Sequence, residues 1–249
     1  VAHQGGDLTD QLPELLDGGI DIAQDGKVSI TAEDDEGLRR AVYYYQDRVR
    51  AGDLKSCIRK PWVKNRISRC FFSPIKRPPL NRDELMDDVD YYPEAYLDRL
   101  AHEGVNGLWI TVVWRDIAET SFTKKSPDAD RRIAKLRRTV ERCKKYGIKV
   151  WVFSIDPACV YPSDPLFVEH PELFGGASYG DDRRLMCTAK PEVQRYIEES
   201  VRDVFGKVPG LGGVLMIAHG ERPPTCLSVI NSVTRDWDYK CCRECAHLE

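Results

Sequence analysis

Short apolar runs alternate with longer amphipathic segments along most of the chain. Four runs have the length of buried strands: 67–73, 107–114, 148–155 and 213–218. Three segments between them repeat apolar residues at the three-and-four spacing of a helix: 93–103, 130–146 and 191–205. Because strands that alternate with amphipathic helices are typical of parallel βαβ units, this pattern predicts an α/β fold with about four such units.

The first sixty or so residues follow a different pattern. Residues 27–32 alternate with the period of a half-buried strand, and residues 37–45 repeat apolar positions at helical spacing. Asp34 and Asp35 precede that helical segment, where acidic residues favour a helix N-terminus. We therefore expect a small α/β domain over residues 1–62 and a second domain over residues 63–249.

The second domain is too short for a complete barrel. An eight-stranded (β/α) barrel takes about 250 residues, more than follow the N-terminal domain. We expect a partial TIM-type barrel, as an open half barrel, a doubly wound sheet or the first half of a longer protein. The isolated chain would then be inactive, and its unpaired sheet edges would favour a homo-oligomer.

Composition and charge exclude several classes of partner. Of the 249 residues, 42% are apolar and 31% charged, and the net charge is -3, so nothing favours nucleic acid or an anionic membrane. No apolar run approaches the ~20 residues that span a bilayer. No charged-then-apolar leader follows Val1, so we expect either that the protein has no secretion signal or that its mature form has lost one. Cysteine usage fits either compartment. We expect a periplasmic or secreted bacterial protein in preference to a cytoplasmic one.

Polar side chains follow the predicted strands where parallel α/β folds carry their reactive groups. These residues are Arg69, Ser73, Arg115, Asp116, Asp156, Tyr161, His219, Glu221 and Arg222. Tryptophans at 109, 114 and 151 lie nearby, and aromatic faces together with carboxylates and arginine suit a sugar. Alternatively, the tryptophans belong to the hydrophobic core, and the charged residues lie in loops or cap helices without binding a ligand.

A family resemblance supports carbohydrate chemistry. Residues 30–43 resemble the small α/β domain that precedes the barrel in family-twenty β-hexosaminidases and in α-glucuronidases. Arg69, the Gly104-Val105-Asn106 turn and the Gly147-Ile148-Lys149-Val150 segment are similar to the opening of their barrel. The resemblance implies a glycoside hydrolase, or the N-terminal portion of one, that acts on N-acetylhexosamine or uronic acid glycans.

The resemblance also implies roles for individual residues. Arg69 matches the arginine that grips substrate hydroxyls, Asp156 the acidic residue after the third strand, and Glu221 the general acid. Gly220 stands where those enzymes have the aspartate that orients the substrate's acetamido group. The second carboxylate of a two-carboxylate mechanism is then Asp156, Asp116 or a residue outside this chain.

Two readings of the site remain open. In the first, Glu221 and Asp156 are catalytic, and four residues bind substrate: Arg69, Asp116, Trp114 and His219. In the second, Glu221 is a structural ion-pair residue, and the chain is a non-catalytic carbohydrate-binding or scaffold protein. A glycan is the expected partner in both, and catalysis requires no cofactor.

Nine cysteines, an odd number, include a cluster at the C-terminal end. Cys242 and Cys245 have the Cys-x-x-Cys spacing of a zinc site, which Cys226, Cys241 or His247 would complete. A structural zinc ion, a disulfide involving Cys226 and free thiols are the alternatives.

Overall fold

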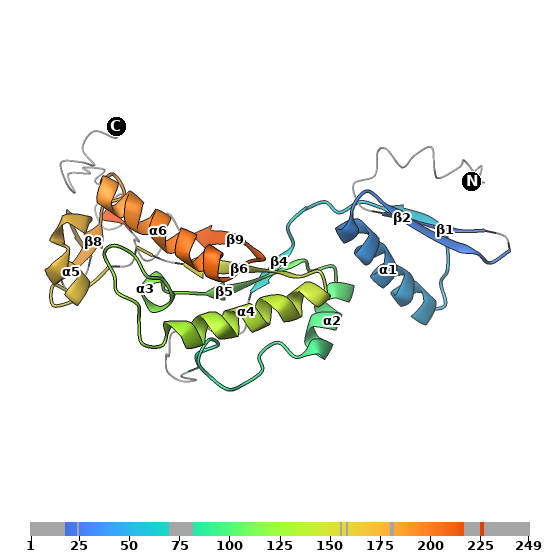
Figure 1. Cartoon of the computed structure of the whole chain (residues 1–249). Coiled ribbons are helices and arrows are strands. Elements are labelled where there is room, and N and C mark those ends of the chain that lie inside the picture. Colours follow the sequence, from blue (N-terminus) through green and yellow to red (C-terminus); the bar gives the residue numbers. More distant parts are fainter. Residues whose placement is uncertain are drawn as a thin grey trace. The chain divides into compact units, whose positions relative to one another are not determined.

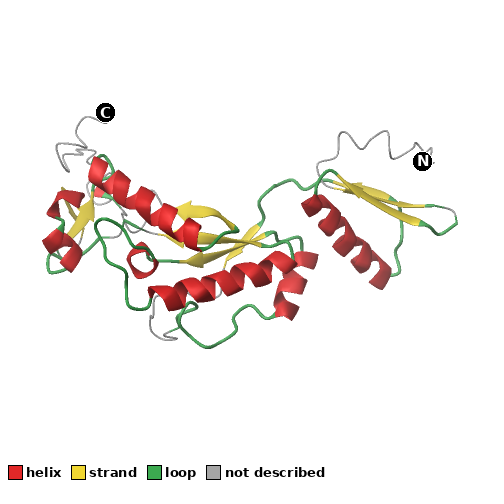
Figure 2. Ribbon diagram, viewed as in Figure 1, coloured by secondary structure: helices red, strands yellow, loops and turns green. Residues whose placement is uncertain are grey.

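A computed structural model describes residues 18–23, 25–69, 82–154, 156–157, 159–179, 182–216 and 225–226. These residues form a mixture of helices and strands that includes a parallel sheet (Figure 2), so the α/β class is confirmed. The chain divides into two compact units. The first comprises Val1–Arg69, Asp90–Leu108 and Glu141–Lys149, and the second comprises Cys70–Val89, Trp109–Val140 and Val150–Glu249.

A small antiparallel sheet begins the described part of the first unit. Its strands β1 (Gly18–Ile22), β2 (Val28–Ala32) and β3 (Cys57–Arg59) lie in the order β2-β1-β3. Side chains along β2 alternate between half-buried and exposed, as its period-2 pattern predicts. Ile20 in the central strand is 3% exposed and pairs with Ile30 and Cys57, so it anchors the apolar face of the sheet.

Helix α1 (Asp35–Arg50) contacts β1 and β2. It begins where the acidic residues predict: the Asp34 carboxylate accepts a 2.8 Å hydrogen bond from the Gly37 N–H and caps the helix. Asp35 and Glu36 lie in its first turn, and Arg48 and Arg50 lie in its last turn. This charge distribution complements the helix dipole.

A network of hydrogen bonds joins the Gly104-Val105-Asn106 turn to Glu36 and Arg66. The Asn106 amide donates to Glu36 Oε1 at 2.6 Å, and its oxygen accepts from the Arg66 N–H at 2.7 Å. Arg66 also donates to Glu36 Oε1 at 2.7 Å and, through Nε, to the Gly104 carbonyl at 2.6 Å. The turn therefore fixes the start of α1 and the residues before the strand at Ile67.

A second sheet contains the four predicted strands, β4 (Ile67–Arg69), β5 (Gly107–Thr111), β6 (Lys149–Ser154) and β9 (Leu211–Met216), in the order β4-β5-β6-β9 (Figure 1). Lys149 N–H donates to the Asn106 carbonyl, and Val112 N–H donates to that of Phe153, so β5 and β6 run parallel. Strand β9 is parallel to β6 and places Met216 opposite Ser154. The second strand was expected to reach Trp114, but it ends at Thr111.

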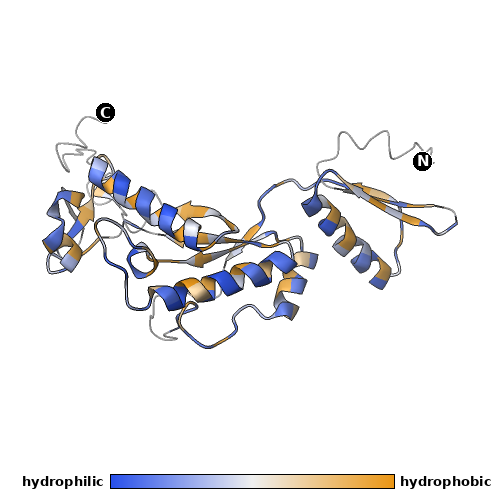
Figure 3. Cartoon of the chain, viewed as in Figure 1, coloured by the Kyte–Doolittle hydropathy of each residue, from blue (hydrophilic) through white to orange (hydrophobic). Residues whose placement is uncertain are grey.

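The three predicted long helices are present as α2 (Glu94–His102), α4 (Ala129–Lys145) and α6 (Pro191–Lys207). Figure 3 shows hydrophilic and hydrophobic residues mixed along α4 and α6, as expected of amphipathic helices. On α6 the buried positions are Val193, Tyr196, Ser200 and Val204, which share one face. No helix in the described ranges is both long and apolar enough to span a bilayer.

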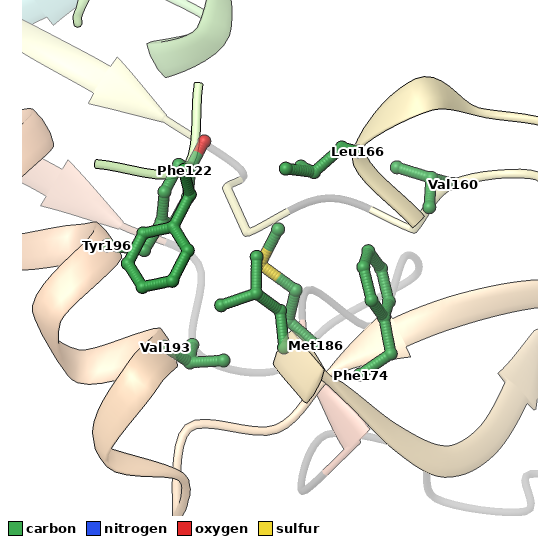
Figure 4. Close-up of a cluster of buried hydrophobic side chains, with 8 residues drawn as sticks. Phe122, Val160, Leu166, Phe174, Met186, Val193 and Tyr196 are labelled. Carbon is green, nitrogen blue, oxygen red and sulfur yellow. The ribbon is translucent and has the colours of Figure 1, made fainter. Parts of the chain in front are cut away.

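The sequence pattern did not predict the folded region between β6 and α6. It contains α5 (Pro165–Glu169), the 3-10 helix Pro171–Leu173 and the hairpin of β7 (Phe174–Tyr179) and β8 (Arg183–Met186). A buried cluster holds it together (Figure 4): Phe122, Val160, Leu166, Leu173, Phe174, Met186, Val193 and Tyr196. Because Val193 and Tyr196 belong to α6, this region packs directly on that helix.

Candidate functional site

Asp156 ties together the carboxyl ends of β5 and β6. Its Oδ2 accepts a 2.7 Å hydrogen bond from the Trp114 backbone N–H and one of 3.2 Å from the Ser154 hydroxyl. The Ser154 oxygen in turn accepts from the Asp156 N–H at 3.1 Å. Asp156 is 5% exposed and Ser154 fully buried, so these contacts supply hydrogen bonds that water does not. Asp156 is therefore a rigid, largely desolvated acceptor.

The helical turn α3 (Trp114–Ile117) follows β5 and presents two charged side chains, Arg115 and Asp116, both half-buried. Arg115 Nη1 lies 2.9 Å from both carboxylate oxygens of Asp164. Burial lowers the pKa of Arg115, but the hydrogen bond and charge of Asp164, together with the charges of Tyr196 and Asp156, raise it by more, so the net shift is upward. Asp164 also caps α5 by accepting from the Leu166 N–H at 2.9 Å. Arg115 is thus held as a permanent cation.

Tyr196 adds a buried phenol to the same electrostatic environment. It is 1% exposed, and burial is the main reason that its pKa is raised, followed by the negative charge of Asp156. Arg115 acts in the opposite direction, and Asp116 makes a smaller contribution that raises the pKa. The phenol therefore stays protonated beside Asp156, Arg115 and Asp116.

The structure brings together three of the predicted site residues, Trp114, Asp116 and Asp156. The Trp114 side chain is only 1% exposed, so its ring packs in the core and does not form an open platform for a sugar. Its indole N–H is buried and has no hydrogen-bond partner within the described ranges. Such a donor is uncommon in a folded protein and marks this strand end as unusual.

The other predicted residues are placed only in part. Arg69 is the last residue of β4, and only its backbone is described. His219, Glu221, Cys242 and Cys245 lie outside the described residues. Their roles remain predictions.

Three residues of this strand-end cluster were not predicted from the sequence: Ser154, Asp164 and Tyr196. Asp164 had a signal, because an aspartate directly before a proline is a common start of a helix. Ser154 and Tyr196 had none, since a serine in an apolar strand and a tyrosine on an apolar helix face are ordinary core residues.

Cys226, the one predicted zinc ligand that is described, lies against β7. A Cβ atom on Gly175 would lie 2.9 Å from Cys226 Sγ and 3.2 Å from Cys187 Cβ, so both cysteines flank this glycine. Both are fully buried. Within the described ranges, no three His, Cys, Asp or Glu side chains gather as metal ligands do.

Comparison with known proteins identifies a similar fold in glycoside hydrolases. No protein-family profile matches the chain, and no curated protein sequence matches it. A solved structure of a GH138 enzyme targeting pectin rhamnogalacturonan II is similar with a TM-score of 0.58 and 15% identity, over 90% of this chain and 26% of that one. At this identity the similarity shows the fold alone.

Two further solved structures match at lower TM-scores. One is a beta-N-acetylhexosaminidase, with a TM-score of 0.47 and 17% identity over 85% of this chain and 49% of that chain. The other is a glycoside hydrolase family 20 beta-N-acetylglucosaminidase, with a TM-score of 0.44 and 12% identity over 95% and 59%. The chain spans less than two thirds of the length of each of these three proteins.

Proposed function

We propose that the chain is a glycoside hydrolase, or the N-terminal portion of one, with its site at the carboxyl ends of β5, β6 and β9. The observation that best supports this proposal is the pairing of Ser154 with Met216 in the parallel strands β6 and β9. Asp156 follows Ser154 by two residues, and Glu221 follows Met216 by five. The two strand ends that precede these candidate carboxylates in the sequence are thus neighbours in the sheet, and a two-carboxylate mechanism needs its two carboxyl groups about 5 to 9.5 Å apart.

The order of strands supports a partial (β/α) barrel in preference to a doubly wound sheet. The order β4-β5-β6-β9 follows the sequence without a reversal, whereas a doubly wound sheet reverses direction at a switch point. Right-handed crossovers that proceed in one direction place their helices on one face. Consistent with this, Arg137 of α4 donates from Nε to the Lys207 carbonyl at the end of α6.

The proposed roles follow from the contacts. Glycoside cleavage needs one carboxyl group that protonates the leaving oxygen and a second that attacks or activates water. Asp156 accepts hydrogen bonds from Trp114 and Ser154, so it suits the acceptor role and leaves the acid role to Glu221. Asp116 is the other candidate for the second carboxylate. An N-acetylhexosamine or uronic acid glycan is the substrate class that we propose, with no cofactor.

The test is hydrolysis of aryl N-acetylglucosaminide, N-acetylgalactosaminide and glucuronide by the full-length protein and by three variants. Glu221→Gln and Asp156→Asn should each reduce kcat at least about a hundredfold, the usual contribution of one general acid or base. The exposed Glu169→Gln on α5 is the matched control and should leave kcat unchanged. Turnover that survives in Glu221→Gln would exclude this residue as the acid.

A non-catalytic carbohydrate-binding protein is the second candidate. Two observations favour it: Gly220 stands where the hexosaminidases have an aspartate, and the Asp156 carboxylate is engaged by backbone and side-chain donors. Saturable glycan binding by the full-length protein, with no turnover across the panel, would establish this function in place of hydrolysis.

A further inference from the structure

Trp62, in the segment that follows β3, is the most exposed large apolar side chain in the described ranges, with a relative exposure of 102%. Val63 beside it is 58% exposed. A tryptophan in a folded protein is usually largely buried, and the type is enriched where proteins bind a partner. The proposed function does not use this segment, so the exposed ring marks a candidate interaction surface of its own.

Hydrogen bonds hold the backbone directly after Trp62. The Arg66 guanidinium donates from Nη1 to the Val63 carbonyl at 2.6 Å and to the Lys64 carbonyl at 3.0 Å. The Asn106 amide also donates to the Lys64 carbonyl, at 2.8 Å. Because this backbone is already ordered, a ligand that stacks on Trp62 pays little conformational entropy for the loop that presents it.

Residues 59–66 carry four cations and no acidic residue: Arg59, Lys60, Lys64 and Arg66. Arg66 pairs with Glu36 at 2.7 Å, whereas the other three form no ion pair with a carboxylate in the part of the chain that the structure describes.

The two lysines are exposed and are the cations nearest to Trp62. Each is two residues away from it, so its Cα atom lies within about 7 Å of the Trp62 Cα atom. Arg59, three residues before Trp62, lies over the Tyr44 ring, 4.4 Å from its centre, an aromatic face that leaves the guanidinium donors available. The exposed indole is therefore surrounded by positive charge that no described carboxylate neutralises.

The chemistry of this segment fits an acidic polysaccharide. The face of a pyranose ring carries C–H groups that pack on an indole, and its hydroxyls stay in water. Uronate carboxylates complement the lysines on both sides of the ring. Proteins that bind single-stranded nucleic acid stack successive bases on several aromatic side chains, whereas this segment contains one. Segments that bind anionic lipid carry about four to eight lysines and arginines, more than the three that are available here.

We propose that residues 59–64 form a binding surface for an acidic polysaccharide, in which Trp62 stacks on a sugar ring while Lys60 and Lys64 pair with uronate carboxylates. The choice of a glycan rests on the proposed function, and the choice of an acidic one rests on the charge of the segment. All of these residues belong to the first unit, and none is a proposed catalytic residue, so this surface is separate from the candidate hydrolytic site.

Fluorescence quenching of the full chain first tests whether the ring is available. Iodide should quench the wild type more strongly than Trp62→Phe, because the variant lacks the exposed indole. The part of the emission that the variant loses should also be more accessible to iodide than to caesium, since the surrounding lysines attract an anion. Equal iodide quenching of the two proteins would show that Trp62 is covered and would overturn the proposal.

Isothermal titration of the full chain at low ionic strength then tests the ligand. Polygalacturonate should bind saturably, and its fully methyl-esterified form, which keeps the sugar rings and lacks the charge, should bind at least about tenfold more weakly. An oligothymidylate and phosphatidylglycerol vesicles should also bind at least about tenfold more weakly. Equal affinity for the ester, the oligonucleotide or the vesicles would contradict the assignment to an acidic glycan.

Substitutions locate the surface. Trp62→Ala should weaken polygalacturonate binding at least about tenfold, and Lys60→Gln and Lys64→Gln about threefold each, as expected for exposed ion pairs. Lys124→Gln, which removes an exposed lysine of the other unit, is the charge-matched control and should leave the affinity unchanged. Wild-type affinity in Trp62→Ala would refute the surface.

The catalytic variant separates this proposal from the proposed function. Glu221→Gln should bind polygalacturonate with wild-type affinity, because Trp62 and the two lysines are unchanged. A chain that hydrolyses no aryl glycoside and still binds through Trp62 contradicts the hydrolase alone, whereas hydrolysis without binding through Trp62 contradicts this surface alone.

Discussion

The Asp156 carboxylate accepts a 2.7 Å hydrogen bond from the backbone N–H of Trp114, a residue 42 positions earlier in the chain. This single contact joins the end of β6 to the turn that follows β5. It also explains why the second strand stops short of Trp114: the Trp114 N–H bonds a side chain, whereas a strand residue would bond a neighbouring strand. The candidate site is therefore built on a contact that also shapes the fold.

We predict that Asp156→Ala lowers the free energy of unfolding by about 2–3 kcal/mol, because it leaves the buried N–H of Trp114 without an acceptor. Asp156→Asn keeps an acceptor oxygen and should cost about 1 kcal/mol. Urea denaturation of both variants measures the difference. Equal stability of the alanine and asparagine variants would show that the contact with Trp114 contributes nothing.

A second prediction concerns neighbouring arginines on α4. Arg132 forms a fork with Asp83 at 3.0 and 3.2 Å, and Asp83 is almost fully buried. Arg132→Leu should cost about 3–5 kcal/mol, because it removes the cation that pairs with this buried charge and leaves it with a hydrogen bond from the Leu85 N–H. Arg131 lies 3.4 Å from the fully exposed Asp88, so Arg131→Leu, the matched control, should cost less than about 1 kcal/mol in ion-pair energy. Similar losses in the two variants, measured by urea denaturation, would contradict this account.

A third prediction concerns two glycines at which replacement by alanine should have opposite effects on stability. Gly213 in β9 has a φ of 156°, and a Cβ there would lie 2.4 Å from the Trp151 ring on the paired strand. Gly213→Ala should therefore lower Tm and destabilise by at least about 2 kcal/mol through overpacking and strain. Gly206 on α6 has no atom within 4 Å of that position, so Gly206→Ala should raise stability by about 0.5–1 kcal/mol. Thermal unfolding that moves both variants in the same direction would disprove the packing argument.

The fourth prediction is a pH dependence. Burial raises the pKa of the Cys143 thiol to about 12, whereas a thiol in the unfolded chain ionises near its ordinary value of about 8.5. Between these values the folded state holds more protons than the unfolded state, so this group makes stability fall as pH rises. The slope is at most about 1.4 kcal/mol per pH unit.

Urea denaturation of Cys143→Ala and of the wild type from pH 8 to 11 measures this contribution. The free energy of unfolding should fall less steeply with rising pH in the variant than in the wild type. Cys159→Ala, which removes a half-buried thiol, serves as the control for the loss of a cysteine side chain. Parallel curves for Cys143→Ala and the wild type would mean that Cys143 does not contribute.

Sequence patterns predicted the elements that depend on interactions between residues close together in the chain. The cap at Asp34, the alternation along β2 and the three-and-four spacing of α6 each depend on residues within a few positions of one another. The four strands of the second sheet were predicted for the same reason, because each is part of a short continuous apolar run. Strand β5 is buried on both faces, as such a run predicts, whereas β9 is half-buried.

The candidate site was predicted only in part. Asp116 and Asp156 were identified because polar groups at strand ends stand out in any parallel α/β pattern. Asp164 and Tyr196 were not predicted as site residues. Their roles depend on the folded region between β6 and α6 and on its packing against α6, which the sequence periodicity did not predict. The Trp114 ring was considered as a sugar platform, and its 1% exposure shows that the core encloses it.

By itself, the sequence determined the α/β class, the order of strands and helices and the strand ends at which polar groups gather, because periodicity and capping act over short stretches of chain. Only the tertiary structure decided that Asp156 bonds Trp114, that Arg115 pairs with Asp164 and that the Asn106 amide bonds the Lys64 carbonyl. Each of these contacts joins residues that are distant in sequence. Their geometry is set by how whole elements pack, which no local pattern encodes.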